Sequence, residues 1–343
     1  MPLMQLAVYT CMLLICWLGA RAIVACGGDE ALGLSTGEFM SLFTYTMQIL
    51  MSLMMLSMVF VMIIMARASA ERICEVLSEE STLKNPEHPV YEVKNGDIQF
   101  DNVVFSYNKK ADKPVLNHVN LNIRSGQTIG VIGGTGSSKS SLVQLIPRLY
   151  DVTEGRVLVG DVDVRDYDIE SLRNEVAMVL QKNVLFSGTI KENLRWGDAD
   201  ATEEEMREAC RIACAEEFIE KMPDGYDTYI EQGGTNVSGG QKQRLCIARA
   251  ILRRPKVLIL DDSTSAVDTA TDAAIRQGLR STLPGTTKVI IAQRISSVQD
   301  ADIIVVLDDG KISGVGSHTE LLKTNEIYRE VYESQQGGGA IDG

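Results

Sequence analysis

Basic residues are in deficit in this sequence. Its 343 residues contain 33 Lys and Arg against 46 Asp and Glu, which gives a net charge of −13. Nucleic-acid binding requires a basic surface that neutralises phosphates, so the composition argues against DNA or RNA as a partner. The deficit is uneven, because Arg21 is the one basic residue before Arg67. The chain therefore divides near Ala66 into an apolar part and a polar, acidic part.

A disulfide framework is also lacking. The seven cysteines are an odd number, and their spacing matches no framework of small secreted domains. They are interpreted as reduced thiols. Cys210 and Cys214 are predicted to share one face of a helix, but no histidine or second cysteine pair lies near them in the sequence. The spacing therefore argues against a metal site.

Two long uncharged runs, residues 3–20 and 43–65, fill most of the apolar part. An α-helix rises 1.5 Å per residue, so the second run would be roughly 35 Å long, enough to cross a hydrocarbon core of roughly 30 Å. The first run is expected to continue to Ala25, with Arg21 reaching the interface. The sequence predicts a transmembrane hairpin.

The charges around these runs predict their orientation. Arg67 and Arg72 follow the second run, and basic residues favour the cytoplasmic side, so the chain is expected to start inside, cross and return. An alternative makes residues 1–26 a secretory signal with a lipoprotein cleavage box ending at Cys26. No basic region precedes its apolar segment, so the hairpin is preferred.

The second run is rich in methionine, with eight between Met40 and Met65. Methionine is flexible and is common at promiscuous binding surfaces. One face of the run is therefore compatible with a path for apolar substrates, and equally with lipid-facing or helix-packing filler.

Short β-branched runs separated by helical segments follow from Asp97 onward. Runs such as VLIL and VIIA are too apolar to alternate, which is typical of strands buried on both faces of a parallel sheet. The pattern predicts an α/β architecture. The runs are IQFDNVVFSY, TIGVIG, VLILDD, KVIIAQ and DIIVVLDDGKI.

Residues 133–141, GGTGSSKSS, nearly match a phosphate-binding loop. TIGVIG precedes them as an expected strand and SSLVQLIPRLY is expected to continue as a helix, which is the context that such a loop requires. Backbone N–H groups and the helix start would supply an anion nest. Lys139 would reach the β- and γ-phosphates of a nucleotide, and Ser140 would offer its hydroxyl to Mg²⁺. The candidate nucleotide-binding residues here are Gly133, Gly134, Thr135, Gly136, Ser137, Ser138, Lys139, Ser140 and Ser141.

Ser138 departs from the strict loop pattern, which has glycine directly before the lysine. If the backbone there requires a positive φ, a Cβ costs about 1–2 kcal/mol. If φ is negative, the serine would help to cap the following helix. In both cases we expect nucleotide binding to be weakened but retained.

Five further segments stand in the order found in ABC transporters. VSGGQKQR at 237–244 resembles the signature motif of that family, and VLILDDSTSAVD at 257–268 resembles its Walker B strand and D-loop. Gln181 matches the Q-loop, Tyr107 the aromatic that stacks on adenine, and IIAQR at 290–294 the switch segment. The chain is thus identified as similar to an exporter-type half-transporter, of the kind that exports drugs or lipids.

This resemblance implies an ATP site shared between two subunits. The phosphate loop and carboxylates of one subunit would face the signature of the other, here Ser238, Gly239, Gly240 and Gln241. Bare backbone amides at a helix start can approach a phosphate closely. Asp261, with Ser140 and Gln181, would hold Mg²⁺, because a hard cation prefers oxygen ligands.

Besides Ser138, two more positions depart from the family pattern on the catalytic half of the site. Asp262 stands where the family usually has a catalytic Glu, and Gln293 where it usually has His. A carboxylate drawn back by one methylene can cost on the order of 100-fold in rate, and an amide cannot carry a proton or positive charge. Asp262, Gln293 and Gln181 are the candidate catalytic residues, and hydrolysis at this site is expected to be slow.

These departures lead to the hypothesis of a degenerate-site subunit in a heterodimer. The chain would hold ATP, and its signature would serve a hydrolysing site on a second half-transporter that bears Glu and His. The alternatives are a homodimer with two slow sites, an ATP-holding regulatory or structural subunit, and a soluble ABC-type ATPase.

The resemblance also suggests how the chain is organised. Residues 1–66 would be the last two transmembrane helices of an exporter membrane domain, 67–95 a cytoplasmic linker helix and connector, 96–336 the nucleotide-binding domain and 337–343 a disordered tail. We expect an N-terminally truncated, multi-pass protein of the plasma (inner) membrane, in contact with lipid, with its nucleotide-binding domain in the cytoplasm. Its exported substrate cannot be named from these motifs.

Overall fold

The computed structural model describes residues 2–25, 34–108, 113–134, 136–262 and 266–337. It divides into a helical unit, Met1–Thr82, and an α/β unit, Leu83–Gly343. Cys26, on which the lipoprotein interpretation depends, lies outside the described residues, as does the predicted tail from residue 338 onward. The predicted domain boundaries themselves stay a prediction.

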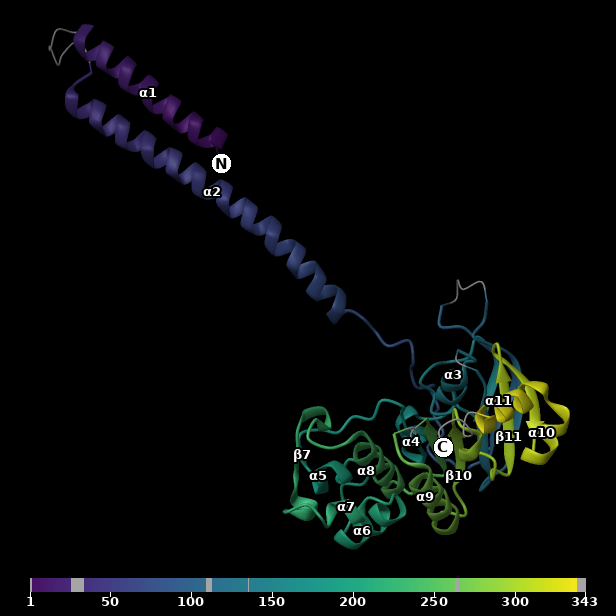
Figure 1. The fold of residues 1–343 in the computed structure, drawn as a ribbon. Helices are drawn as coiled ribbons and strands as arrows, with labels where there is room; N and C mark the ends of the chain where they lie inside the picture. The colour runs from purple at the N-terminus through teal and green to yellow at the C-terminus, as the bar shows by residue number, and fades with distance from the viewer. Residues whose placement is uncertain (1, 26–33, 109–112, 135, 263–265, 338–343) are drawn as a thin grey trace. The chain divides into compact units, whose positions relative to one another are not determined.

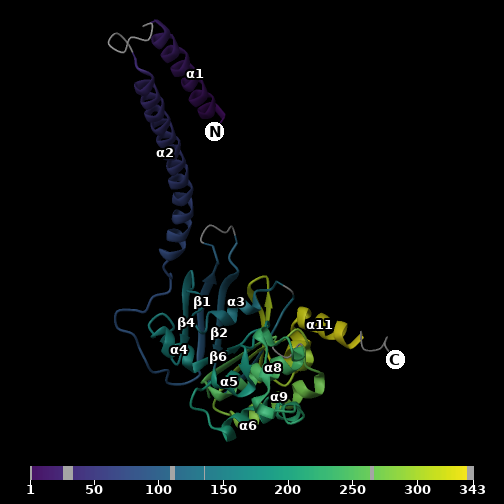
Figure 2. The ribbon, with the colours of Figure 1, turned by 90° about the vertical axis from the view of Figure 1, so that its left-hand side faces the viewer.

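The helical unit consists of α1 (Pro2–Ala25) and α2 (Thr36–Leu77), which lie side by side in Figures 1 and 2. Both helices are long and apolar enough to cross a membrane, by length and composition alone. They approach closely at Gly19, where a Cβ would lie 2.1 Å from a ring carbon of Phe39. The paired apolar helices are consistent with the predicted hairpin.

The α/β unit contains a six-stranded sheet in the order β12-β11-β3-β10-β9-β6. All neighbouring pairs are parallel except β11 and β12. The predicted α/β architecture is confirmed, and every residue of β3, β9 and β10 is buried. The strands are β3 (Thr128–Ile132), β6 (Val176–Val179), β9 (Val257–Asp261), β10 (Thr287–Ile291), β11 (Ile303–Asp308) and β12 (Lys311–Gly316).

A separate antiparallel sheet, in the order β2-β1-β4-β5, lies beside the parallel one. The first β-branched run of the sequence belongs to it as β1, whose burial alternates as one face packs on the core. Its strands are β1 (Ile98–Phe105), β2 (Leu116–Ile123), β4 (Glu154–Val159) and β5 (Val162–Asp163), and a short pair is formed by β7 (Gly188–Thr189) and β8 (Tyr229–Ile230).

Helices occupy two regions of the unit. One group lies together around β7 in Figure 1: α5 (Ile190–Arg195), α6 (Glu203–Ile212), α7 (Glu216–Ile219) and α8 (Gly239–Leu252). The others are α3 (Lys139–Gln144), α4 (Ile169–Glu175), α9 (Thr269–Thr282), α10 (His318–Thr324) and α11 (Glu326–Gly337).

The parallel sheet separates two hydrophobic cores. Leu258 and Leu260 of β9 point into the core formed with α6 and α8, whereas Val257 and Ile259 point into the core shared with the antiparallel sheet. This alternation follows from the two-residue period of a strand. Both faces of the sheet are therefore covered, and its functional groups are left at the ends of the strands.

Two local expectations were wrong. Cys214 lies beyond the end of α6 with φ 53°, so it does not share a helix face with Cys210, whose thiol pKa is raised to about 12 by burial. The helix after the phosphate loop ends at Gln144, earlier than the run SSLVQLIPRLY indicates. Pro147 lacks the N–H that a further helical turn needs, and Arg148 adopts φ 50°.

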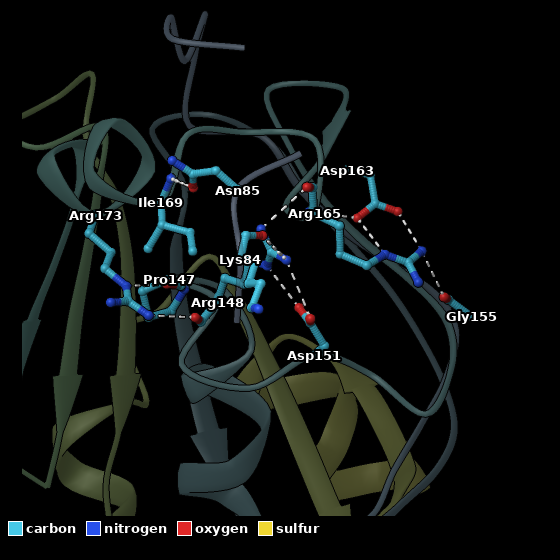
Figure 3. Close-up of polar contacts among 10 residues, drawn as sticks. All are labelled: Lys84, Asn85, Pro147, Arg148, Asp151, Gly155, Asp163, Arg165, Ile169 and Arg173. Carbon is cyan, nitrogen blue, oxygen red and sulfur yellow. Dashed lines mark hydrogen bonds and ion pairs between the residues drawn. The ribbon is translucent and has the colours of Figure 1, made fainter. Parts of the chain in front are cut away.

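Arg148 anchors the connector that enters the α/β unit, as Figure 3 shows. Its side chain is only 6% exposed and bonds Asp151 at 2.8 Å. The same guanidinium donates to the carbonyls of Lys84, at 3.2 Å, and Arg165, at 3.3 Å. Asn85 of the connector accepts from the Ile169 N–H at 3.0 Å. A buried guanidinium thus fixes the connector to the segment that follows α3.

Replacing Arg148 should destabilise the α/β unit. Arg148→Met removes donors from two carbonyls and the partner of Asp151, so we expect a loss of about 2–3 kcal/mol of unfolding free energy. Denaturant unfolding of the full chain in detergent, followed by Trp196 fluorescence in a Trp17→Phe background, measures it. Arg156→Met is the control, because the exposed Arg156–Asp101 pair contributes at most about 1 kcal/mol. Equal losses in both variants would contradict the anchoring role.

Candidate functional site

The phosphate-loop sequence connects β3 to α3. Gly133 has no space for a side chain, because a Cβ would lie 2.1 Å from the Leu307 carbonyl oxygen. Lys139 Nζ folds over the loop and donates to the carbonyls of Gly133 and Gly134 at 2.8 and 2.9 Å. Burial lowers the pKa of this ammonium. Thr135 lies outside the described residues.

Ser138 adopts the left-handed conformation, with φ 71° and ψ 22°. Its side chain makes no capping hydrogen bond to α3, so the alternative in which it caps the helix is wrong. This conformation is the one that glycine adopts at no steric cost. Ser138 therefore adopts a backbone conformation that glycine, the residue of the strict pattern, would adopt without strain.

Asp261 ends β9 beside the phosphate loop. Its Oδ1 accepts a hydrogen bond of 3.1 Å from the Ser140 hydroxyl, which comes from the first turn of α3. Asp261 is 5% exposed, and burial raises the pKa of its carboxyl, opposed by the Ser140 hydrogen bond. A hydroxyl and a carboxylate in contact at the strand end are the donor set that Mg²⁺ prefers.

Asp262 gathers the two predicted glutamines around one oxygen. Its Oδ2 accepts from Gln181 Nε2 at 3.2 Å and from Gln293 Nε2 at 2.7 Å. Burial raises the pKa of this carboxyl, and the two amide hydrogen bonds oppose the rise. The backbone of Asp262 is also left-handed, with φ 45°, a conformation that Asp tolerates better than most residues.

The topology explains this convergence. The strands β6, β9 and β10 are parallel neighbours, and Gln181, Asp262 and Gln293 each follow the carboxyl end of one of them. Carboxyl ends of parallel strands meet at one edge of a sheet, where α/β proteins bind ligands. Residues 81 and 31 positions apart in the sequence thereby come into contact with Asp262.

Tyr107 lies next to the phosphate-loop helix. Its hydroxyl contacts Ser141 Oγ at 2.9 Å and donates to Gln144 Oε1 at 3.2 Å. The ring is 54% exposed and meets Tyr150 edge-on, at 5.0 Å between centroids. An exposed aromatic ring therefore stands beside the loop, and Tyr150, which no spacing in the sequence singles out, supports it.

The signature residues begin α8. Ser238 and Gln241 form a reciprocal capping box, with bonds of 2.9 and 3.3 Å between backbone N–H groups and side-chain oxygens. Ser238 and Gly239 are exposed, and a Cβ on Gly240 would lie 3.0 Å from the Ala266 carbonyl. Within the described ranges, Ser238–Gln241 contact residues of α8 and Ala266 and make no hydrogen bond to the phosphate loop.

Gln243 is a buried residue that sequence reasoning missed. Its Oε1 accepts from the Ala266 N–H at 3.1 Å, so it ties α8 to the segment that follows the carboxylates. A single glutamine inside a helical pattern gives no signal of such a contact.

The site as a whole can receive a polyphosphate and a hard cation. A glycine-containing loop and a lysine lie next to a hydroxyl–carboxylate pair at the carboxyl edge of a parallel sheet. Loop amides and a helix start bind phosphate, and the oxygen pair suits Mg²⁺. These features define the class of P-loop nucleotide-binding domains.

Comparison with known proteins narrows the class. The family described as ABC transporter matches residues 116–265. "Uncharacterized ABC transporter ATP-binding protein YfiB" of Bacillus subtilis is 40% identical over 98% of this chain, and "Multidrug resistance protein pgp-1" of Caenorhabditis elegans is 42% identical over 72%. A solved structure of a bacterial Atm1-family ABC exporter with ATP bound has a TM-score of 0.79 and 32% identity, over 97% of this chain.

The chain belongs to the ABC transporter family, with an ABC-type ATP-binding domain preceded by apolar helices. It spans 57% of the length of the Bacillus relative, 19% of that of the Caenorhabditis relative and 57% of the solved exporter chain. The roles of individual site residues remain predictions.

Relieving the backbone at Ser138 should stabilise the protein. Ser138→Gly removes a Cβ from a left-handed residue and so should raise the unfolding free energy by roughly 0.5–1 kcal/mol, after allowing for the greater entropy of glycine in the unfolded chain. Ser138→Ala keeps the Cβ and should change little, since no side-chain cap is lost. Unfolding of both variants, followed by Trp196 fluorescence, tests this. A glycine variant no more stable than the alanine variant would contradict the strain.

Proposed function

We propose that this chain is the ATP-binding and membrane-spanning part of an ABC exporter subunit, which couples ATP binding and hydrolysis to export. The observation that carries the proposal is the contact between Ser140 and Asp261 next to the phosphate loop, in a chain that also has two helices apolar enough to span a membrane. In this proposal the helices cross the plasma (inner) membrane, contact lipid and leave the α/β unit in the cytoplasm.

ATP and Mg²⁺ fit the residues present. Lys139 would exchange its loop carbonyl partners for phosphate oxygens, and the exposed ring of Tyr107 would stack on adenine. Asp261, Ser140 and Gln181 would hold Mg²⁺, which when bound supplies positive charge to the phosphate oxygens. The space at Gly134 supports this fit, because a Cβ there would meet no atom within 4 Å, so the loop is open to a ligand.

Hydrolysis at this site is proposed to be slow. A water-activating carboxylate must reach the attacking water, and Asp262 is one methylene shorter than Glu and has a left-handed backbone. Gln293 can donate a hydrogen bond but cannot bear a positive charge near the γ-phosphate. The site would therefore hold ATP for long periods.

The exposed signature supports a partner subunit. Ser238 and Gly239 are accessible at the start of α8, where their amides can approach a phosphate on another chain. We infer that they complete the ATP site of a second half-transporter that bears Glu and His, in a heterodimer.

An apolar groove beside Gln181 supports coupling to a membrane domain. The groove has a volume of about 310 Å³ and is lined in part by Val184, Phe186 and Trp196. The rings of Phe186 and Trp196 stack at 4.7 Å, yet are 44% and 64% exposed. We propose that a cytoplasmic segment of the membrane domain, beyond the two helices of this chain, occupies the groove. A displacement of Gln181 on nucleotide binding would then be transmitted through this segment to the membrane domain.

The function is tested by ATP hydrolysis of the reconstituted pair. The full chain is co-reconstituted in lipid vesicles with a half-transporter that has Glu and His at the matching positions. Asp262→Ala should leave most ATP hydrolysis in place, whereas Ser238→Ala should lower it on the order of tenfold or more, because a hydrogen-bond donor to developing charge is lost.

Ser317→Ala is the matched control for Ser238→Ala. Ser317 caps α10 with the same kind of capping box, so its loss has a similar cost of about 1 kcal/mol without touching the signature. Hydrolysis unaffected by Ser238→Ala would overturn the shared site. Hydrolysis abolished by Asp262→Ala would instead favour a homodimer-like site that does its own chemistry, and ATP binding without hydrolysis or transport would favour an ATP-holding subunit.

A further inference from the structure

The end of the switch segment and the residues that follow it, together residues 293–297, are contacted by α11. Gln335 of α11 accepts from the Ile295 N–H through Oε1 at 2.9 Å, and its Nε2 donates to the Gln293 carbonyl at 2.8 Å. One side-chain amide thus bonds backbone groups on both sides of Arg294. A two-point contact of this kind fixes the orientation of a short segment as well as its position.

The helix that delivers Gln335 is itself held firmly. Tyr328 is fully buried in the core, and its hydroxyl contacts His318 Nδ1 at 2.8 Å. Asn325 precedes the helix and accepts from the Tyr328 N–H at 2.9 Å. Tyr332, one turn before Gln335, packs against the same core. Gln335 therefore projects from an anchored helix.

The opposite end of residues 293–297 is fixed by α9. The Ser297 hydroxyl donates to Asp272 Oδ2 at 2.9 Å, and both residues are buried. Gln335 holds the carbonyl of Gln293 itself, and the Gln293 side chain donates to Asp262 at 2.7 Å. The direction of the Gln293 amide thus depends on where its backbone is held.

We propose that Gln335 is a positioning residue for the nucleotide site, acting through the backbone of Gln293. The effect of Gln335 on ATP hydrolysis rests on the proposed function. Its contacts with Gln293 and Ile295 do not depend on that function. The position of α11 thereby determines how closely Gln293 approaches Asp262. Hydrolysis at this site would therefore depend on how α11 packs against the α/β unit.

The first test measures the switch backbone without nucleotide. Gln335→Met keeps the length and helix propensity of the side chain but removes both hydrogen bonds. In the full chain, hydrogen exchange of the Ile295 amide should become roughly fivefold to tenfold faster, as expected for one lost hydrogen bond. Gln336→Met is the matched control, since Gln336 bonds Tyr332 of its own helix. Equal exchange in the two variants would overturn the proposal.

The second test follows ATP. Gln335→Met should slow single-turnover hydrolysis by the full chain on the order of tenfold, because ångström-scale misplacement can cost on the order of 100-fold, while ATP affinity stays within about twofold. In a Gln293→Ala background the same change should add no further loss, since residues acting through one another are not additive. An additive loss would overturn the role of Gln335.

The two tests separate two kinds of failure. If the unaltered chain bound no ATP, the proposed function would fall, and with it any role of Gln335 in turnover. If ATP bound but the exchange of the Ile295 amide did not respond to Gln335→Met, the proposed function would stand and the positioning role would be wrong.

Discussion

The hydrogen bond between Ser140 and Asp261 is the contact on which the rest of the site depends. It joins the first turn of the phosphate-loop helix to the end of the central strand β9. Because β9 is buried along its whole length, that strand end cannot move independently of the core. The loop, the carboxylates and the two glutamines are therefore positioned by a single sheet edge. Arg148, which follows α3, holds the connector through the Lys84 carbonyl.

The structure shows how the residues that depart from the family pattern are held at this sheet edge. Ser138 keeps the backbone course of glycine with φ 71°, which supports retained nucleotide binding. Asp262 accepts hydrogen bonds from two amides that follow the neighbouring strands, and its side chain is one methylene shorter than the Glu that the family usually has. We propose that a site of this kind binds ATP firmly but activates water poorly. The exposed signature residues Ser238 and Gly239 fit a role at another subunit's site, which remains our proposal.

Much of the fold could be predicted from the sequence, and the reasons for the failures are physical. Apolar runs such as VLIL predict buried strands, and the glycines and lysine of residues 133–141 predict the phosphate loop. Short helices and turns give no such signal. The sequence pattern therefore places Cys214 on α6, which ends before it, and does not indicate that α3 ends at Gln144. Contacts such as Gln335 with Gln293 are set by tertiary packing between distant elements, and no local pattern encodes them.

The central claim is that this site holds ATP rather than consuming it. The most direct measurement loads the purified full chain with Mg²⁺ and ATP labelled on the γ-phosphate, removes free nucleotide and follows the bound species over time. The account predicts that intact ATP remains bound for many minutes, and that Asp262→Glu converts it to ADP on the order of 100-fold faster. Rapid conversion to ADP by the unaltered chain would contradict the account.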